Sequence, residues 1–324
     1  MTSTQHIQQP ADENKEHLSA EGRRMGVIYC PRPGGKRLWR KIKRCLNETE
    51  AEFDYFVSEN SADVERLAAI MTRNGYGRII VVGGDAALGY AVNGVMKTCN
   101  ETGNKPALGV IPAGYGNDFA KYWGIEPADY RQTVKGLMAG RMRRIDVGRC
   151  NVTENGETRT EYFVNCVNIG VAASIMNLRH LTFSVLGLRT VSYFVSSLVL
   201  LFSRMSYRMA LTTSGERFER RAMTLCVGSA RGYGQTPSAV PYNGQLDISL
   251  VTTSQLTQLV HGLYLLFTGR FLSHKGISVW RTRRVKFELT DYAPLSLDGR
   301  FVCAKAESLG VDIMQEAIDF LIVK

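Results

Sequence analysis

Two glycine-rich turns carry the residues of this chain that are best suited to binding a phosphate. Each turn follows a short apolar run, at residues 78–82 and 108–111. The residues of the turns are mostly small or polar: Gly83, Gly84, Asp85, Ala86 and Ala87 in the first, and Gly114, Tyr115, Gly116, Asn117 and Asp118 in the second. Where such a turn opens a helix, its unpaired backbone N–H groups and the positive end of the helix dipole favour an anion. Two turns of this kind predict a cradle for nucleotide phosphates.

The elements that must position these turns alternate regularly between strand and helix. Apolar patterning predicts strands at 26–29, 54–57, 78–82 and 108–111, and helices at 38–45, 62–74, 88–98 and 118–122. This alternation predicts a doubly wound parallel α/β domain over residues 25–144. Ligands of such sheets bind at the carboxyl ends of the strands, which is where both glycine turns fall.

A different pattern begins near residues 141–145. Short alternating segments separated by turn residues follow, at 144–149, 162–168, 207–212, 222–227, 246–251, 279–280 and 284–289. Frequent strands at this spacing predict an antiparallel β-rich sandwich, which we place at residues 145–324.

Two apolar segments of helical length, at 185–202 and 254–272, interrupt the strands. Arg189 lies within the first, and Gln258 and His261 lie within the second. The uninterrupted apolar stretches are shorter than the roughly 20 residues that cross a bilayer. We interpret both segments as helices packed against the sheet, and leave open that one of them lines a lipid pocket.

The composition restricts the partners and the compartment. The 324 residues are 44% hydrophobic and carry a net charge of +10, which favours anionic partners or simply aids solubility. The 7 cysteines form no Cys-x-x-Cys pair, which indicates a reducing compartment rather than a disulfide framework. Residues 1–24 are polar and have no apolar signal-peptide core, so we predict a disordered tail and a cytoplasmic protein.

Several motifs resemble those of one enzyme family. Residues 30–36, Cys-Pro-Arg-Pro-Gly-Gly-Lys, are similar to an Asn-Pro-x-Ser-Gly nucleotide loop, and residues 114–120 resemble a Gly-Thr-Gly-Asn-Asp-Phe-Ala signature. The segments 145–148, 162–165, 243–247 and 297–300 resemble motifs of the second domain. On these residues the chain, from about Arg24 onward, resembles the diacylglycerol kinase catalytic-domain family, which includes bacterial soluble lipid kinases and sphingosine kinases.

The resemblance implies an activity and a set of site residues. It implies an ATP-binding domain, a lipid-holding β-rich domain, and magnesium-assisted phosphoryl transfer from ATP to a hydroxyl of a diacylglycerol-like or sphingoid lipid. The implied catalytic residues are Asp85 and Asp298, and Asp146 and Asn243 are the implied metal ligands. The implied ATP-binding residues are those of the two glycine turns together with Cys30, Pro31, Gly34, Gly35 and Ser58. We expect peripheral contact with a membrane, expect no nucleic acid partner because the basic residues are dispersed, and leave a homodimer open.

Other positions depart from the family pattern. Ala86 and Ala87 stand where the family has Gly and Thr. A left-handed backbone at residue 86 would cost Ala about 1 to 2 kcal/mol, and a lost hydroxyl at residue 87 about 1.5 to 3 kcal/mol. Together these changes predict nucleotide use weakened by about two or three orders of magnitude unless the loop repacks. Further replacements are Cys30 for Asn, Tyr90 for Glu, Tyr115 for Thr, Asn243 for Asp and Arg300 for Glu.

The residues alone leave several roles open. Asp85 could order its loop, hold magnesium through water, face the acceptor, or cap the helix that begins near Leu88. Tyr115 could stack on the adenine or fill its space, and we interpret Arg300 as an exposed cation in preference to a phosphate ligand. The main alternative function is a degenerate kinase that binds lipid or nucleotide as a regulatory module. A nicotinamide-nucleotide kinase is a weaker alternative.

Overall fold

The computed structural model describes residues 24–49, 51–114, 116–175, 206–213, 216–252, 261–262, 265 and 270–323. The predicted tail (apart from Arg24), the predicted helix at 185–202, most of the predicted helix at 254–272, and Tyr115 lie outside the described residues.

Four parallel strands form the sheet of the first domain, in the order β2-β1-β3-β4. Their bounds are β1 Met25–Tyr29, β2 Phe53–Val57, β3 Arg78–Gly83 and β4 Ala107–Pro112. All residues of β1 and β4 are buried. A parallel sheet needs cover on both faces, so continuously apolar strands of this kind require helices on either side.

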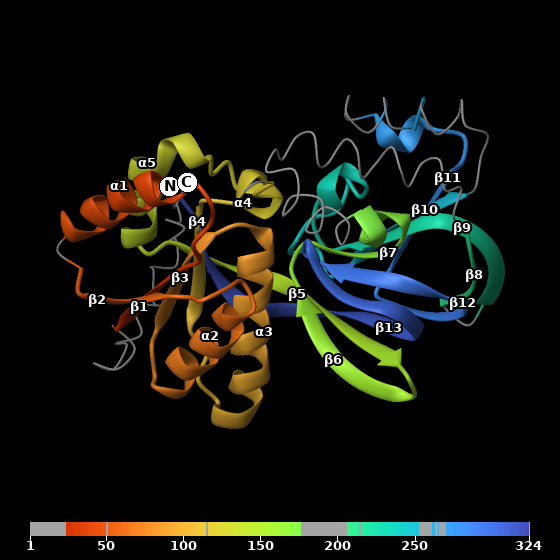
Figure 1. The fold of residues 1–324 in the computed structure, drawn as a ribbon, viewed down its shortest axis with the longest axis horizontal. Helices are drawn as coiled ribbons and strands as arrows, with labels where there is room; N and C mark the ends of the chain where they lie inside the picture. The colour runs from red at the N-terminus through yellow and green to blue at the C-terminus, as the bar shows by residue number, and fades with distance from the viewer. Residues whose placement is uncertain are drawn as a thin grey trace, which may run out of the picture.

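Those helices lie on both faces of the sheet, as Figure 1 shows. Helices α2 (Asp63–Arg73) and α3 (Asp85–Thr102) pack on one face, and α1 (Lys36–Asn47) and α5 (Tyr130–Met138) pack on the other. The short α4 (Asp118–Tyr122) and the 3-10 turn η2 (Pro127–Asp129) connect β4 to α5. The predicted doubly wound domain is confirmed, and α5 is an element that the sequence pattern missed.

The second domain is built from antiparallel strands around a separate core. The strands are β5 (Met142–Glu154), β6 (Glu157–Phe163), β7 (Cys166–Gly170), β8 (Tyr207–Thr213), β9 (Glu216–Gly228), β10 (Leu246–Thr252), β11 (Ile277–Thr282), β12 (Arg284–Leu297) and β13 (Arg300–Leu321). Two 3-10 turns, η3 (Gly232–Gly234) and η4 (Phe271–Ser273), join them. The predicted antiparallel β-rich domain is confirmed.

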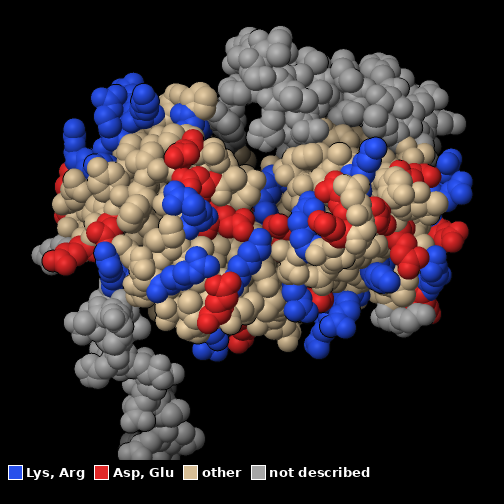
Figure 2. Space-filling view, turned by 60° about the horizontal axis from the view of Figure 1, so that its bottom comes forward, with Lys and Arg blue, Asp and Glu red and all other residues tan. Residues whose placement is uncertain are grey.

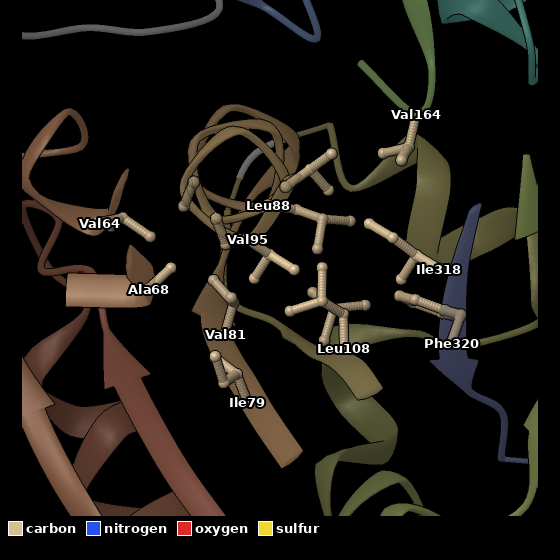
Figure 3. Close-up of a cluster of buried hydrophobic side chains, with 14 of the residues drawn as sticks. Val64, Ala68, Ile79, Val81, Leu88, Val95, Leu108, Val164, Ile318 and Phe320 are labelled. Atoms are coloured by element: carbon tan, nitrogen blue, oxygen red, sulfur yellow. The ribbon is translucent and has the colours of Figure 1, made fainter. Parts of the chain in front are cut away.

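The last strand returns to the first domain. The end of β13 pairs in parallel with β4, through Phe320 and Leu108. Figure 3 shows Ile318 and Phe320 pointing into the cluster that also contains Leu108 and Leu88. The boundary expected near residue 145 falls inside β5, which runs beside β13 along this crossing. The division at residue 144 stays a prediction. The structure adds that the end of the chain returns from the second domain to the sheet of the first.

One segment expected as a single strand is two. The run at 162–168 is interrupted between Phe163, the end of β6, and Cys166, the start of β7. The backbone N–H groups at this break bond to a side chain rather than to a neighbouring strand. All residues of the run except the two asparagines are apolar, so periodicity could not locate the break.

Within the described part of the chain, no helix is both long and apolar enough to span a bilayer.

Candidate active site

The two glycine turns lie against each other at the carboxyl ends of neighbouring strands. Gly83 and Pro112 are paired residues of β3 and β4, and the Gly83 carbonyl accepts the N–H groups of Ala113 (2.8 Å) and Gly114 (3.1 Å). A Cβ added to Gly84 would lie 2.9 Å from Gly114 Cα, and one added to Gly114 would overlap Gly84 Cα. This backbone contact requires glycine at both positions.

Asp85 joins the first turn to the helix that follows the second. Its carboxylate accepts the N–H groups of Asp118 and Phe119, both at 3.0 Å, and so caps α4. Asn117, the N-cap residue of α4, has a left-handed φ of 53° and accepts the Gly114 N–H through Oδ1 at 3.0 Å. Asp85 lies in the first turn of α3, whose N-cap is Gly84, so of the roles left open for Asp85 the structure shows ordering of the turns through capping of α4.

Two carboxylates therefore meet at this corner. Burial raises the pKa of Asp85, and burial together with the charge of Asp85 raises the pKa of Asp118 to about 6. Both Asp85 oxygens are engaged by backbone N–H groups, whereas the Asp118 carboxylate accepts no hydrogen bond from any described residue. Asp118 is thus the carboxylate with free acceptor capacity for a cation or a donor.

The first loop reaches the same corner. Cys30 N donates to the Val82 carbonyl, and Gly34 has a left-handed φ of 74°. Arg32 Nη1 donates to the Gly114 carbonyl at 3.2 Å, which places a guanidinium beside the glycine turns. Arg32 was not among the predicted site residues, although it is the first of two cations in the 30–36 loop. Pro31 and Gly35 belong to the same loop, in which Pro31 is exposed and Gly35 is buried.

The side chains of two predicted nucleotide residues have partners outside the glycine turns. Ser58 is buried and both its N–H (2.9 Å) and its hydroxyl (3.4 Å) donate to the Tyr29 carbonyl. The Cys30 thiol lies 3.6 Å from the Ser61 hydroxyl. Tyr115 lies outside the described residues, so its two alternative roles stay as predictions.

The alanine replacements fit the helix without backbone strain. Ala86 lies inside α3, and neither it nor Ala87 has a positive φ. The strain expected at residue 86 is absent because helical backbone suits Ala well. Ala87 is buried in the core cluster, and its Cβ would lie 2.8 Å from a Cβ added to Gly83. What remains of the predicted loss is the missing Thr hydroxyl at residue 87.

Asp298 lies at the junction of the domains, at the turn between β12 and β13. It is fully buried, has a left-handed φ of 47°, and accepts the N–H groups of Val164, Asn165 and Cys166, each at 2.9 Å. A Cβ added to Gly89 would lie 2.9 Å from Asp298 Cβ, so Asp298 packs on α3 one turn beyond Asp85. Burial raises the pKa of Asp298 to about 6, although these N–H groups and Arg300 oppose the shift.

Tyr233 is a further residue of this junction that the sequence pattern did not single out. It lies in η3 with a left-handed φ of 55°. A Cβ on Gly299 would lie 2.6 Å from its hydroxyl, and one on Gly116 would lie 3.7 Å from its ring. Burial raises its pKa well above the usual value, and the charge of Asp85 adds to the shift. The sequence signal that could have found it is a tyrosine flanked by two glycines, Gly232 and Gly234. In the structure both glycines have a positive φ.

Arg300 is not an exposed cation, which corrects the expectation. It is 5% exposed and donates to Glu161 Oε2 at 2.8 Å and to the Tyr162 carbonyl at 2.9 Å. Its guanidinium lies over the ring of Tyr90, 5.0 Å from the centroid. The two replacements at residues 90 and 300 therefore contact each other.

The predicted metal ligands are neighbours, but their oxygens are already engaged. The Asp146 carboxylate accepts the N–H groups of Gly244 (2.6 Å) and Glu316 (3.0 Å), and Asn243 Oδ1 accepts the Gln245 N–H at 2.9 Å. No cluster of three or more His, Cys, Asp or Glu residues suited to a metal occurs among the described residues. Asp146 and Asn243 thus already have backbone partners, and their implied role as metal ligands stays a prediction.

Comparisons with known proteins agree with this architecture. Residues 24–150 match the family model "Diacylglycerol kinase catalytic domain", and residues 165–317 match "YegS C-terminal NAD kinase beta sandwich-like domain". The chain is 24% identical over 291 residues to a diacylglycerol kinase of Bacillus subtilis, covering 86% of this chain and 90% of the relative. It is 23% identical over 288 residues to one of Staphylococcus saprophyticus, covering 86% and 89%.

Solved structures show the same fold. A diacylglycerol kinase of Bacillus anthracis superimposes with a TM-score of 0.69 at 18% identity, covering 93% of this chain and 97% of that one. Yeast NADH kinase complexed with NADH superimposes with a TM-score of 0.51 at 10% identity, covering 92% and 83%. From the two family models, which together span most of its length, the chain belongs to the diacylglycerol kinase catalytic-domain family.

Proposed function

We propose that the protein is an ATP-dependent lipid kinase that phosphorylates a hydroxyl of a diacylglycerol-like or sphingoid lipid. The observation that carries this proposal is the arrangement along the start of α3. The glycine turns meet at Gly84 and Gly114 beside its first residue, and Asp298 packs on Gly89 one turn later. A phosphate donor at the helix N-terminus and an acceptor at Asp298 would then lie next to each other.

The phosphates would bind at the N-terminus of α3. That helix has 18 residues and no side-chain cap, so its first N–H groups and its dipole remain available to an anion. The Arg32 guanidinium beside Gly114 would offset further phosphate charge. Magnesium would screen the charge of the phosphates, and Asp118 is the residue that would hold it, because its carboxylate is partly exposed and not engaged by described residues.

Transfer requires the acceptor hydroxyl to be placed and deprotonated. As the lipid oxygen bonds to the γ-phosphorus, the bond from that phosphorus to the bridging oxygen of ADP breaks, and the hydroxyl proton passes to a carboxylate. We assign this role to Asp298, because the three N–H groups that it accepts leave one of its roughly four lone-pair sites open, on Oδ2. Asp85 would hold the two glycine turns in register. Since Asp298 is ionised above its pKa of about 6, it is a competent acceptor at neutral pH.

Helix α1 offers a surface for an anionic membrane. It carries six cations and no acidic residue, listed here as Lys36, Arg37, Arg40, Lys41, Lys43 and Arg44. Tyr55, Phe56 and Val57 of the neighbouring β2 are exposed, and Lys43 Nζ lies 3.7 Å from the Tyr55 ring centroid. Figure 2 shows a group of Lys and Arg side chains at its upper left, on the side where α1 lies in Figure 1. Cations with exposed aromatic residues suit peripheral contact with acidic lipid headgroups.

The test is transfer of labelled phosphate from ATP to lipid in mixed micelles. Dioctanoylglycerol and sphingosine are offered separately, in the presence of magnesium. We expect labelling of one of them, and a loss of about 100-fold or more in Asp298→Asn, the range of a lost acid–base group. Lys305→Gln, an exposed change on β13, is the matched control. No transfer to either lipid by a folded protein contradicts the proposal.

A degenerate kinase that binds lipid as a module is the second candidate. The observations that favour it are the missing hydroxyl at Ala87 and the engagement of both Asp85 oxygens. Titration calorimetry separates the two candidates. Micromolar binding of magnesium-ATP supports the enzyme, whereas lipid binding without any ATP binding supports the module.

A further inference from the structure

A second pocket lies between the two domains, away from the candidate active site. Its volume is about 820 Å³, and α3 and the loop after it form one wall while β5, β12 and β13 form the other. The residues of α3 that line it are Met96, Cys99 and Asn100, at the opposite end of the helix from Asp85. At about 1.5 Å per residue, Asn100 is about 22 Å along the axis from Asp85. The pocket is thus separate from the glycine turns.

One cation of the pocket is held rigidly in place. Arg149 forms a two-point ion pair with Asp312, with Nε–Oδ1 at 3.1 Å and Nη2–Oδ2 at 2.9 Å. Arg284 Nε lies 3.9 Å from the same Asp312 carboxylate. Asp312 is therefore shared between two guanidinium groups, and its single negative charge cannot neutralise both of their positive charges.

Two further cations have no acidic partner. Lys105 and Arg283 are exposed residues of the lining, and neither has a carboxylate within 4.0 Å among the described residues. Lys105 comes from the loop before β4 and Arg283 from the turn before β12, so the two domains each contribute one. The remaining acid of the lining, Glu316, is 65% exposed and lies 3.9 Å from Arg144. The lining holds four cations against two carboxylates, an excess of two positive charges.

Part of the lining is apolar. Met96, Ile313, Met314 and Ala317 contribute to it. Beside these residues, a bulge in β13 shifts the register between Met314 and Ile318, and Glu316 has a left-handed φ of 47°. An occupant would therefore meet unpaired cations and thioether and aliphatic groups from both walls of the pocket.

We propose that this pocket binds the phosphate group of an amphiphilic phosphate monoester. Arginine forks pair with phosphate oxygens in two-point contacts, and a dianion matches the excess of two charges. The apolar lining would accept the adjoining hydrocarbon part. Because the cations come from both domains, the occupant would bridge the loop before β4 and the turn before β12. This inference rests on the pocket alone and not on the proposed kinase activity.

The experiment measures hydrogen–deuterium exchange of the full-length protein with three probes. These are inorganic phosphate, dihexanoyl phosphatidic acid below its micelle concentration, and uncharged dihexanoylglycerol. We expect phosphatidic acid to slow exchange in peptides covering residues 96–106 and 281–286. If inorganic phosphate also slows exchange, the affinity comes from the phosphate group alone. If phosphatidic acid slows exchange and inorganic phosphate does not, the apolar lining contributes part of the affinity.

Two double variants locate the effect. Lys105→Gln with Arg283→Gln removes the unpaired cations, and we expect affinity for phosphatidic acid to fall by about tenfold. Lys286→Gln with Lys305→Gln removes two exposed charges outside the pocket, and we expect this control to change the affinity for phosphatidic acid by less than about twofold. Equal losses in both variants, equal slowing by dihexanoylglycerol, or no slowing in these peptides overturns the proposal.

Discussion

The guanidinium of Arg300 lies over the ring of Tyr90, 5.0 Å from its centroid, at the contact between α3 and β13. The same guanidinium is bonded to Glu161 on β6 at 2.8 Å. Tyr90 and Arg300 are two of the positions expected to depart from the family pattern, and the structure shows that they contact each other. A buried cation and a partly buried aromatic ring thus form one contact between the two domains.

We predict that Arg300→Met lowers the free energy of unfolding by about 3 to 5 kcal/mol, because it leaves Glu161 buried without its main partner. Glu161→Gln in the Arg300→Met background should recover part of this loss, since the unpaired charge is then gone. Urea unfolding monitored by circular dichroism measures both. Tyr90→Phe, which keeps the ring, is the control and should be nearly neutral. Recovery of nothing in the double variant would contradict the pairing.

We predict that Gly114→Ala abolishes nucleotide binding while the protein still folds. The added methyl overlaps Gly84 Cα, so the two glycine turns must separate and the N-terminus of α3 loses its neighbour. Calorimetric titration with magnesium-ATP measures the effect. Gly310→Ala is the matched control, because no heavy atom lies within 4 Å of a Cβ at that position. Unchanged ATP binding in Gly114→Ala would refute a phosphate site at these turns.

We predict that Gly299→Ala weakens activity more than it weakens ATP binding. The new Cβ would lie 2.6 Å from the Tyr233 hydroxyl, and the φ of 79° is strained for Ala, at a cost of about 1 to 2 kcal/mol. Tyr233 must then move away from Asp298, on the acceptor side of the site. Steady-state kinetics with varied lipid and varied ATP separate the two effects. A change confined to the KM for ATP would show that Tyr233 serves the nucleotide instead.

We predict that Asp118 makes the protein less stable as pH rises from about 4 to about 6. The pKa of Asp118 is raised to about 6 in the folded state from 3.8, so the native protein binds more protons in this interval and loses stability as they dissociate. In Asp118→Asn this contribution, about 1 to 3 kcal/mol, should be absent. Urea unfolding at pH 4, 5 and 6 compares the two proteins. Identical pH dependences would show that the Asp118 pKa is not raised.

We predict that Asp146 stabilises the protein without any metal. Its carboxylate bonds the N–H groups of Gly244 and Glu316, which joins β5 to the turn before β10 and to β13. Asp146→Ala should cost about 1 to 3 kcal/mol by leaving these donors unpaired. Thermal unfolding with and without a chelator, and with added magnesium, tests whether a metal contributes to this stability. A large shift of the unfolding temperature on chelation would support Asp146 as a metal ligand instead.

Features that depend on residues close together in the chain could be predicted from the sequence. Apolar runs followed by glycine turns located β3, β4 and the start of α3, because strand and helix periodicity and the need for glycine at a close backbone contact are local properties. The two-domain architecture followed from the change of pattern near residue 145. The location of both turns at the carboxyl ends of the strands also followed from the sequence, whereas the contact between Gly84 and Gly114 is a finding of the structure.

The partners of each charged side chain were decided only by the tertiary structure. Asp298 bonds to N–H groups more than 130 positions away, Asp85 caps α4 instead of its own helix, and Arg300 is buried against Glu161. Arg32 and Tyr233 join the site through folding of separate loops onto it. Such contacts depend on which segments the topology brings together, and neither periodicity nor residue type within one segment contains that information. The composition and local pattern of this chain determined most of its elements and the position of its glycine turns, whereas long-range packing determined the partners of each carboxylate.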